Sequence, residues 1–214
     1  MISIITADII NSRKLANQEI WITPLKKLLS TYGATPEKWE IYRGDYFQVE
    51  IENPEEALLL SLKIKALIKS IIVTEDKRKI APIDVRMAIG LGTKEYAADR
   101  ISESNGTAFI NSGEKFEKLK KEKITLAIQS SFPNFDYEMN LYLKLAVIQM
   151  DAWTVNSAAL FTTLFDDPEK TQSEIGTVLG IEQNSVSGRF KRAHVEEILE
   201  LDKMYRYKLK ELNQ

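Results

Sequence analysis

The sequence predicts an α+β fold, with a sheet domain followed by an all-α domain. Two observations predict this class: short apolar runs alternate with helical patterns up to about residue 130, and the pattern after that point is helical throughout. The composition agrees, because 214 residues that are 44% hydrophobic and 28% charged can form one or two domains with a substantial core.

The first elements predict a strand, a helix and a hairpin. The apolar, β-branched run at 2–10 is typical of a buried central strand and ends near Asp8. Residues 18–32 have helical spacing. Two alternating segments between 39 and 51 then meet at Arg43-Gly44-Asp45, a combination that suits a tight turn.

A helix and two further strands complete this part of the chain. Asn53 followed by Pro54 is a strong helix start, and the helical pattern runs to about Ile71. The remaining elements are a strand at 82–92, a helix in the second half of 106–121 and a strand at 124–129. The order βαββαβαβ predicts a ferredoxin-like core, with helices packed on one face of the sheet.

Composition and period change at 130–138, where proline and polar residues interrupt the pattern. We therefore predict an α+β domain at 1–132 and a helical domain at 133–214. Helices are expected at 139–150 and 153–165, followed by three more.

The residue types exclude several chemistries. The chain has no cysteine and one histidine, His194, so disulfides, thiolate catalysis and histidine-rich metal clusters are excluded. The net charge of −2 gives no global attraction to nucleic acid, so any DNA contact has to be local. The first run is too short to span a bilayer and lacks the features of a signal peptide, so we expect a cytoplasmic protein without membrane partners.

Residues 171–193 carry the most specific local pattern, that of a helix-turn-helix. Thr171 and Glu174 form a capping box, Gly180 ends the first helix, and Val186 and Phe190 give the second an apolar side. The other side of that helix combines base-reading and phosphate-binding residue types: Gln183, Asn184, Ser185, Ser187, Arg189, Lys191 and Arg192. The pattern favours DNA binding in a major groove, although a plain helical hairpin with a solvated face has the same spacing.

A long helix follows Ala193. Its apolar positions, which include Val195, Ile198 and Leu201, suit either packing on its own domain or dimerisation. We expect His194 to face solvent at the joint between the two helices.

Two aspartates in the sheet part could form a metal site. Asp8 ends the first strand and Asp45 lies at the tip of the hairpin, which is expected beside that strand. With the backbone carbonyl of Ile9 they would offer oxygen ligands to Mg²⁺ and a nucleotide's phosphates. The alternative is that Asp45 only completes a turn and Asp8 accepts hydrogen bonds from the loop at 11–14.

Both parts resemble known families. The stretch "TQSEIGTVLGIEQNSVSGRFKRA" is similar to the helix-turn-helix of sigma-factor region four, with Gly176 where an alanine is expected, a change that should weaken the helix slightly. The landmarks of the sheet part resemble class III nucleotidyl cyclases and related GGDEF-type domains. These landmarks are the Asp-Ile pair, the Gly-Asp hairpin, "VRMAIGLG" and a helix beginning near Asn111. The whole chain looks like the SatD family of small bacterial proteins.

The cyclase resemblance implies that Asp8, Asp45 and the Ile9 carbonyl hold Mg²⁺ or Mn²⁺. It also implies that a nucleotide is bound by Arg43, Asn111 and Lys115. The chain departs from the cyclase pattern at two positions. Lys115 stands where cyclases have a catalytic arginine, and it is the only candidate for that role, without the bidentate fork of a guanidinium. Ile41 stands where cyclases read the base, so a purine-selective cyclase is not expected.

Three hypotheses about function follow. The first is a bacterial DNA-binding regulator that forms a homodimer and has a degenerate cyclase-like domain, with or without a nucleotide and metal bound. The second is an active metal-dependent nucleotidyl cyclase or transferase. The third is a protein-interaction module that does not bind DNA.

Overall fold

The computed structural model describes residues 1–42, 44–73 and 83–212. Its strands are β1 (Ile2–Ile10), β2 (Trp39–Tyr42), β3 (Tyr46–Ile51), β4 (Asp84–Gly92) and β5 (Leu126–Gln129). Its α-helices are α1 (Glu19–Leu29), α2 (Ala57–Ser70), α3 (Thr107–Glu122), α4 (Pro133–Asp151), α5 (Val155–Asp166), α6 (Gln172–Leu179), α7 (Gln183–Ala193) and α8 (Val195–Leu212). The predicted α+β class is confirmed.

The strands form one mixed sheet in the order β2-β3-β1-β4-β5. The central strand β1 is antiparallel to both β3 and β4, and β5 is parallel to β4. Asp8 lies opposite Tyr46 on one side and Arg86 on the other. This register brings three chain segments together at one end of the sheet.

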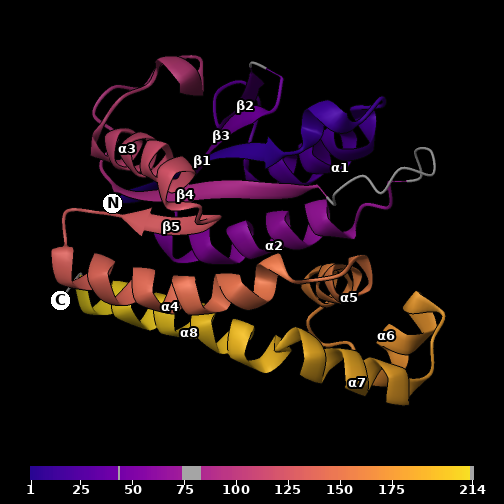
Figure 1. Ribbon diagram of the computed structural model, residues 1–214. Coiled ribbons are helices and arrows are strands. Elements are labelled where there is room, and N and C mark those ends of the chain that lie inside the picture. Colours follow the sequence, from indigo (N-terminus) through magenta and orange to yellow (C-terminus); the bar gives the residue numbers. More distant parts are fainter. Residues whose placement is uncertain (43, 74–82, 213–214) are drawn as a thin grey trace.

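Helices cover both faces of the sheet, so the expectation of helices on one face is wrong (Figure 1). Ile5 and Met87 belong to the large core that includes α1 and α2, whereas Ala88 packs with Phe116 of α3. The α3 helix approaches closely because β4 carries glycine: a Cβ at Gly90 would lie 2.2 Å from the backbone oxygen of Ala108. The α3 helix also spans nearly all of 106–121 rather than its second half.

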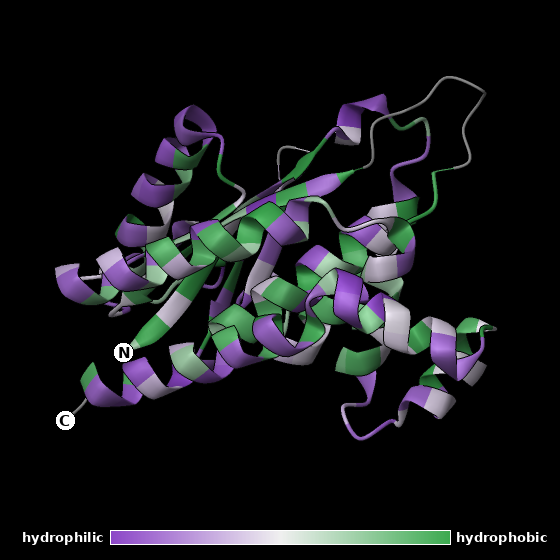
Figure 2. Cartoon of the chain, turned by 60° about the horizontal axis from the view of Figure 1, so that its bottom comes forward, coloured by the Kyte–Doolittle hydropathy of each residue, from purple (hydrophilic) through white to green (hydrophobic). Residues whose placement is uncertain are grey.

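The helical part shares a core with the sheet part. The large apolar cluster extends from β1 and α2 through α4 and α5 to α8, where Tyr205 donates a 2.8 Å hydrogen bond to the oxygen of Pro54. Figure 2 shows hydrophobic residues gathered where the helices meet the sheet and hydrophilic ones on their outer sides. Among the described residues, no helix has the length and apolar character needed to cross a membrane.

Buried charges also join the two parts. Lys65 of α2 is fully buried and pairs with Asp84, 2.9 Å away, and with Asp151 at the end of α4. Lys69 donates a 2.8 Å hydrogen bond to the backbone oxygen of Asp151 and lies 3.3 Å from Asp84. Because two aspartates offset two buried lysines, this pairing compensates the lysine charges that are withdrawn from water, while Asp151 keeps 37% of its side chain exposed.

Candidate functional site

Asp8 and Asp45 come together at the end of β1, as predicted. The backbone nitrogen of Ile9 donates a 3.1 Å hydrogen bond to the backbone oxygen of Asp45, which fixes the hairpin against the strand. The Asp45 carboxylate accepts a 2.6 Å hydrogen bond from the Ser12 hydroxyl. Asp45 therefore ties the hairpin to the loop after β1, which is part of what the turn alternative predicted. In that alternative, however, the acceptor in contact with the loop was Asp8.

The Asp8 carboxylate is in an unusual environment. Its Oδ1 atom is buried and has no hydrogen-bond partner among the described residues, and its Oδ2 atom lies 3.6 Å from the Arg86 guanidinium. Burial raises the pKa of Asp8, and nearby Asp45 raises it further, while Arg86 and Lys120 act in the opposite direction. A buried carboxylate oxygen without a donor is a suitable ligand for a hard cation.

Both aspartates line a hollow of about 670 Å³. Its charged lining is mixed, since Arg13, Arg86 and Lys120 offset Asp8, Asp45 and Glu117. Tyr42 and Tyr46 form an aromatic wall, with ring centroids 4.8 Å apart. Carboxylates that can hold a divalent cation beside cations that can bind phosphate are the groups that a metal–nucleotide complex requires.

The donor set for a metal is small. Asp8 and Asp45 offer carboxylate oxygens, and the described residues contain no group of three or more His, Cys, Asp or Glu side chains placed to hold a metal ion. The orphaned Asp8 oxygen nevertheless fits Mg²⁺ or Mn²⁺, which keep several waters and take their other ligands from phosphates.

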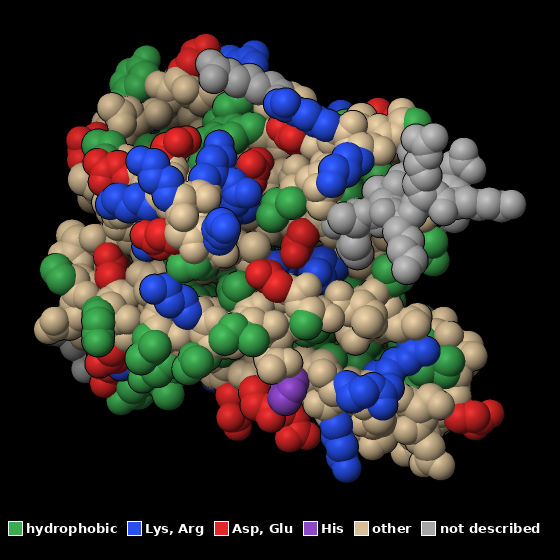
Figure 3. Space-filling view, viewed as in Figure 1, with side chains coloured by type: hydrophobic (Ala, Val, Ile, Leu, Met, Phe, Trp, Pro, Cys, Tyr) green, Lys and Arg blue, Asp and Glu red, His purple; other side chains and the backbone are tan. Residues whose placement is uncertain are grey.

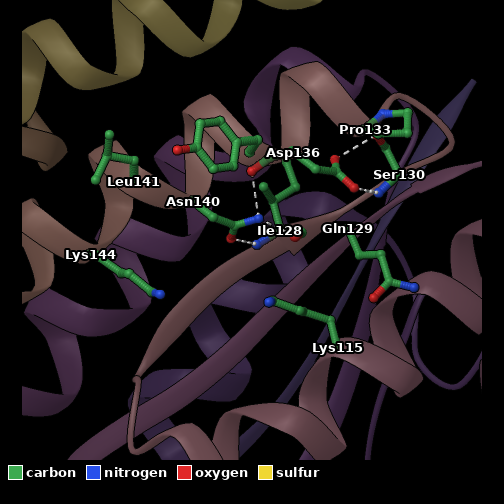
Figure 4. A pocket seen from close by; sticks show the side chains of 10 residues that line it. Lys115, Ile128, Gln129, Ser130, Pro133, Asp136, Asn140, Leu141 and Lys144 are labelled. Atoms are coloured by element: carbon green, nitrogen blue, oxygen red, sulfur yellow. Dashed lines mark hydrogen bonds between the residues drawn. The ribbon is translucent and has the colours of Figure 1, made fainter.

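The other residues expected near a nucleotide are not brought to this hollow. Asn111 donates a 2.8 Å hydrogen bond to the oxygen of Leu91, which pairs with Ser3 at the opposite end of β1 from Asp8. Lys115 points into a different pocket between α3, β5 and α4, near Asn140 and Lys144 (Figure 4). Arg43 lies outside the described residues.

Lys120 is the α3 lysine that lines the Asp8 hollow, where it lies over the Phe116 ring. Lys115 does not line this hollow, because five residues rotate a helix by about 140° and positions 115 and 120 therefore face different surroundings. Arg86 was also missed. The signal that could have found it is its charge within the mostly apolar run at 82–92, where Asp84 is the other charged residue.

The predicted helix-turn-helix is present. Thr171 and Glu174 form the capping box, with the Thr171 nitrogen 2.8 Å from a Glu174 carboxylate oxygen. Gly180 ends α6 in the left-handed conformation, at φ 64°. Gly176 does more than weaken the helix, because a Cβ there would lie 2.6 Å from the backbone oxygen of Ile181. Glycine allows the turn to fold back closely on α6.

One face of α7 is open to solvent, while Val186 is fully buried against the neighbouring helices. Gln183, Asn184, Ser185, Lys191 and Arg192 are exposed, and Ser187 and Arg189 are half-buried. Within the described residues, no salt bridge includes Arg189, Lys191 or Arg192. These three cations therefore remain available to anions in solution.

Trp153 supports α7 from behind. Its indole nitrogen donates a 3.2 Å hydrogen bond to the oxygen of Ala193, the last residue of α7. Its ring stacks on Phe161 of α5, with centroids 4.1 Å apart. His194 follows in the left-handed conformation with 41% of its side chain exposed, which agrees with its expected place at the joint.

Comparisons of the chain with protein-family models, with curated proteins and with solved structures found no match. The functional argument therefore depends on the geometry of the hollow and of α7.

Proposed function

We propose that this protein is a bacterial DNA-binding transcriptional regulator, with α7 as the recognition helix. The observation that carries the proposal is the open face of α7 on a capped helix-turn-helix. Gln183, Asn184 and Ser185 lie in its first turn, which is where recognition helices of this type contact base edges. The three cations follow toward its end, where they can bind phosphates.

The overall charge does not oppose this proposal. A net charge of −2 gives the whole chain no long-range attraction to DNA, but phosphate contacts act within a Debye length of about 8 Å at physiological salt. Three cations on one helix, without a salt bridge in the part of the chain that the structure describes, are a local basic patch at that scale. We expect modest affinity that decreases steeply with salt.

Selection from random DNA tests the proposal directly. The wild type should enrich a sequence, and each of Arg189→Ala, Lys191→Ala and Arg192→Ala should lower the slope of log affinity against log salt by roughly 1, because each removes one cation that binds a phosphate. Lys203→Ala, which removes an exposed cation of α8, is the matched control and should leave the slope unchanged. Failure to enrich any sequence would sink the proposal and favour the protein-interaction module.

We propose further that the sheet part is a cyclase-like domain of the SatD type that binds a nucleotide with Mg²⁺ or Mn²⁺ at the Asp8 hollow. The strand order β2-β3-β1-β4, with β1 antiparallel to both neighbours, supports a ferredoxin-like core. When bound, the metal would neutralise phosphate charge. The protein's own part would be to hold the metal through Asp8 and Asp45 and the phosphates through Arg86 and Lys120.

Thermal unfolding with nucleoside mono-, di- and triphosphates and either metal tests this second step, because a ligand of the native state raises stability. The wild type and the control Asp99→Ala, at an exposed aspartate, should be stabilised. Asp8→Ala and Asp45→Ala should not. No response of the wild type to any nucleotide would leave the sheet part as a scaffold.

An active nucleotidyl cyclase or transferase is the second candidate function. The observation that favours it is the presence of Arg86 and Lys120 in the hollow, since these cations could stabilise charge during phosphoryl transfer. Product formation from nucleoside triphosphates that is abolished by Asp45→Asn would support the enzyme. Turnover that survives Asp45→Asn would not originate in this site.

A further inference from the structure

Large apolar side chains are exposed along one side of α4. Tyr137, Leu141, Leu145 and Ile148 are 77%, 48%, 60% and 65% exposed, and Met204 of the adjacent α8 is 43% exposed. The spacing of four, four and three residues places the α4 members on one helix face. We call these five residues the apolar stripe. Figure 3 shows hydrophobic side chains gathered over α4 and α8.

The apolar stripe continues into a groove between α4 and α8. The groove has a volume of about 370 Å³ and includes Leu145, Leu201 and Met204 in its lining. Together the stripe exposes on the order of 500 Å² of apolar surface, which is close to the upper limit for patches on soluble monomers. A surface of this kind marks a binding site for a protein or a lipid.

Near the middle of the stripe, its two long edges carry opposite charge. Lys144 lies on the edge toward α3 and faces the same pocket as Lys115. Glu197 and Glu200 of α8 line the groove on the other edge. Other charges nearby are already engaged. Asp136 accepts hydrogen bonds from Ser130, and Lys208 of α8 pairs with Glu138 of α4. Around Leu145 the stripe therefore has a basic side and an acidic side, which complement a copy of the stripe in one relative orientation.

We propose that the apolar stripe binds the same stripe of a second copy of this chain, around a two-fold axis parallel to α4. Such an axis exchanges the two edges, so Lys144 approaches the partner's Glu200 across the interface. An antiparallel arrangement would instead place like edges together. The apolar area and its charged borders approach the roughly 800 Å² per partner that a standard interface buries.

The parallel axis has a consequence for DNA binding. The α4 helix runs toward the helix-turn-helix, so both α7 helices come to the same end of the dimer (Figure 1). Dimeric helix-turn-helix proteins read two half-sites in this way. Only this last step rests on the proposed function, because the contact between stripes does not require DNA.

The mass in solution without DNA tests the inference. We expect a dimer by sedimentation or light scattering at about 100 µM, a concentration that reveals even weak self-association. Leu145→Glu should give a monomer, since it buries a charge in the interface. The control is Val178→Glu on α6, where the native side chain is 59% exposed and outside the stripe, and it should remain a dimer. A cooperative thermal unfolding transition in both variants shows that they are folded, and Leu145→Glu should unfold at the lower temperature because it lacks the partner.

Charge reversal tests the axis. Lys144→Glu and Glu200→Lys should each weaken the dimer by about tenfold, and the double variant should recover it, because the reversed edges again face opposite charge. A double variant weaker than either single one overturns the parallel axis.

A wild type that is monomeric overturns the inference, and one that is monomeric but sediments with anionic vesicles assigns the stripe to a lipid surface instead. A monomer that still selects a DNA sequence leaves the proposed function standing. A dimer that selects no DNA sequence leaves the contact between stripes standing and overturns the proposed function.

Discussion

The Asp8 hollow and the open face of α7 are built from very different parts of the chain. The hollow collects side chains from β1, the hairpin, β4 and α3, so it exists only when the sheet has formed. The α7 face and the turn that orients it lie within residues 171–193. The comparison teaches that the first site depends on long-range packing, whereas the second depends on local signals and a supporting core.

The two regions also treat charge differently. Asp8 is held in a mixed-charge hollow where burial raises its pKa, whereas the cations of α7 project from an open helix. The first environment favours a specific ligand that compensates a poorly solvated carboxylate. The second favours a polyanion that binds over a surface and is sensitive to salt.

The largest effect should follow from breaking the long-range charge pairing under the sheet. Lys65→Met leaves Asp84 and Asp151 without their fully buried partner, and we expect a loss of about 3 kcal/mol in the free energy of unfolding. Chemical denaturation measures it, with Lys63→Met on the same helix as the control. Equal losses in the two variants would show that the pairing does not hold the two parts together.

A smaller and more local effect should follow from Gly176→Ala. The added Cβ would meet the Ile181 backbone oxygen at 2.6 Å, so the turn must open, and we expect a loss of about 2 kcal/mol. Gly188→Ala on α7 is the matched control. Its Cβ would meet only the movable end of Arg192, at 3.2 Å, and alanine should stabilise the helix by about 0.5–1 kcal/mol. Thermal unfolding distinguishes the two, and a stabilised Gly176→Ala would contradict the close turn.

The same contrast explains what the sequence could predict. Thr171, Glu174 and Gly180 act on neighbouring residues, so local rules were sufficient for the capping box and the end of α6. The proximity of Asp8 and Asp45 could be predicted because the hairpin was expected beside the first strand. The assignment of helices to the two faces of the sheet could not be predicted, because β1 is buried on both sides and its pattern does not show which helix covers which side. Lys120 and Arg86 could be assigned to the hollow only once the faces were known, whereas Lys115 was selected from the cyclase resemblance.

A capping variant measures the local contribution by itself. Thr171→Ala removes the side chain that accepts a hydrogen bond from the Glu174 nitrogen, and it should lower stability by about 1 kcal/mol. DNA affinity should decrease only as far as α6 unfolds, since Thr171 is not on α7. A loss of affinity at temperatures where the variant remains fully folded would indicate that Thr171 itself contacts DNA.

The smallest effect is a pH dependence at Asp8. Because burial raises the pKa of this carboxyl above its usual 3.8, the ionised form costs the native state stability at neutral pH. The wild type should regain that stability as the pH falls through the raised pKa, and the cost should be absent below 3.8. Asp8→Asn should therefore be more stable than the wild type at pH 7, and the difference should shrink as the pH falls.

Arg86→Met sharpens this test, because losing the guanidinium 3.6 Å away should raise the pKa of Asp8 further and enlarge the pH dependence. A difference between wild type and Asp8→Asn that is constant with pH would contradict the environment described for this carboxylate. Mg²⁺ should stabilise the wild type as acid does, but by binding the ionised carboxylate at pH 7, and it should leave Asp8→Asn unchanged. If Mg²⁺ removes the destabilisation that ionised Asp8 causes, the hollow binds a ligand. If it does not, the hairpin aspartate serves only to complete a turn.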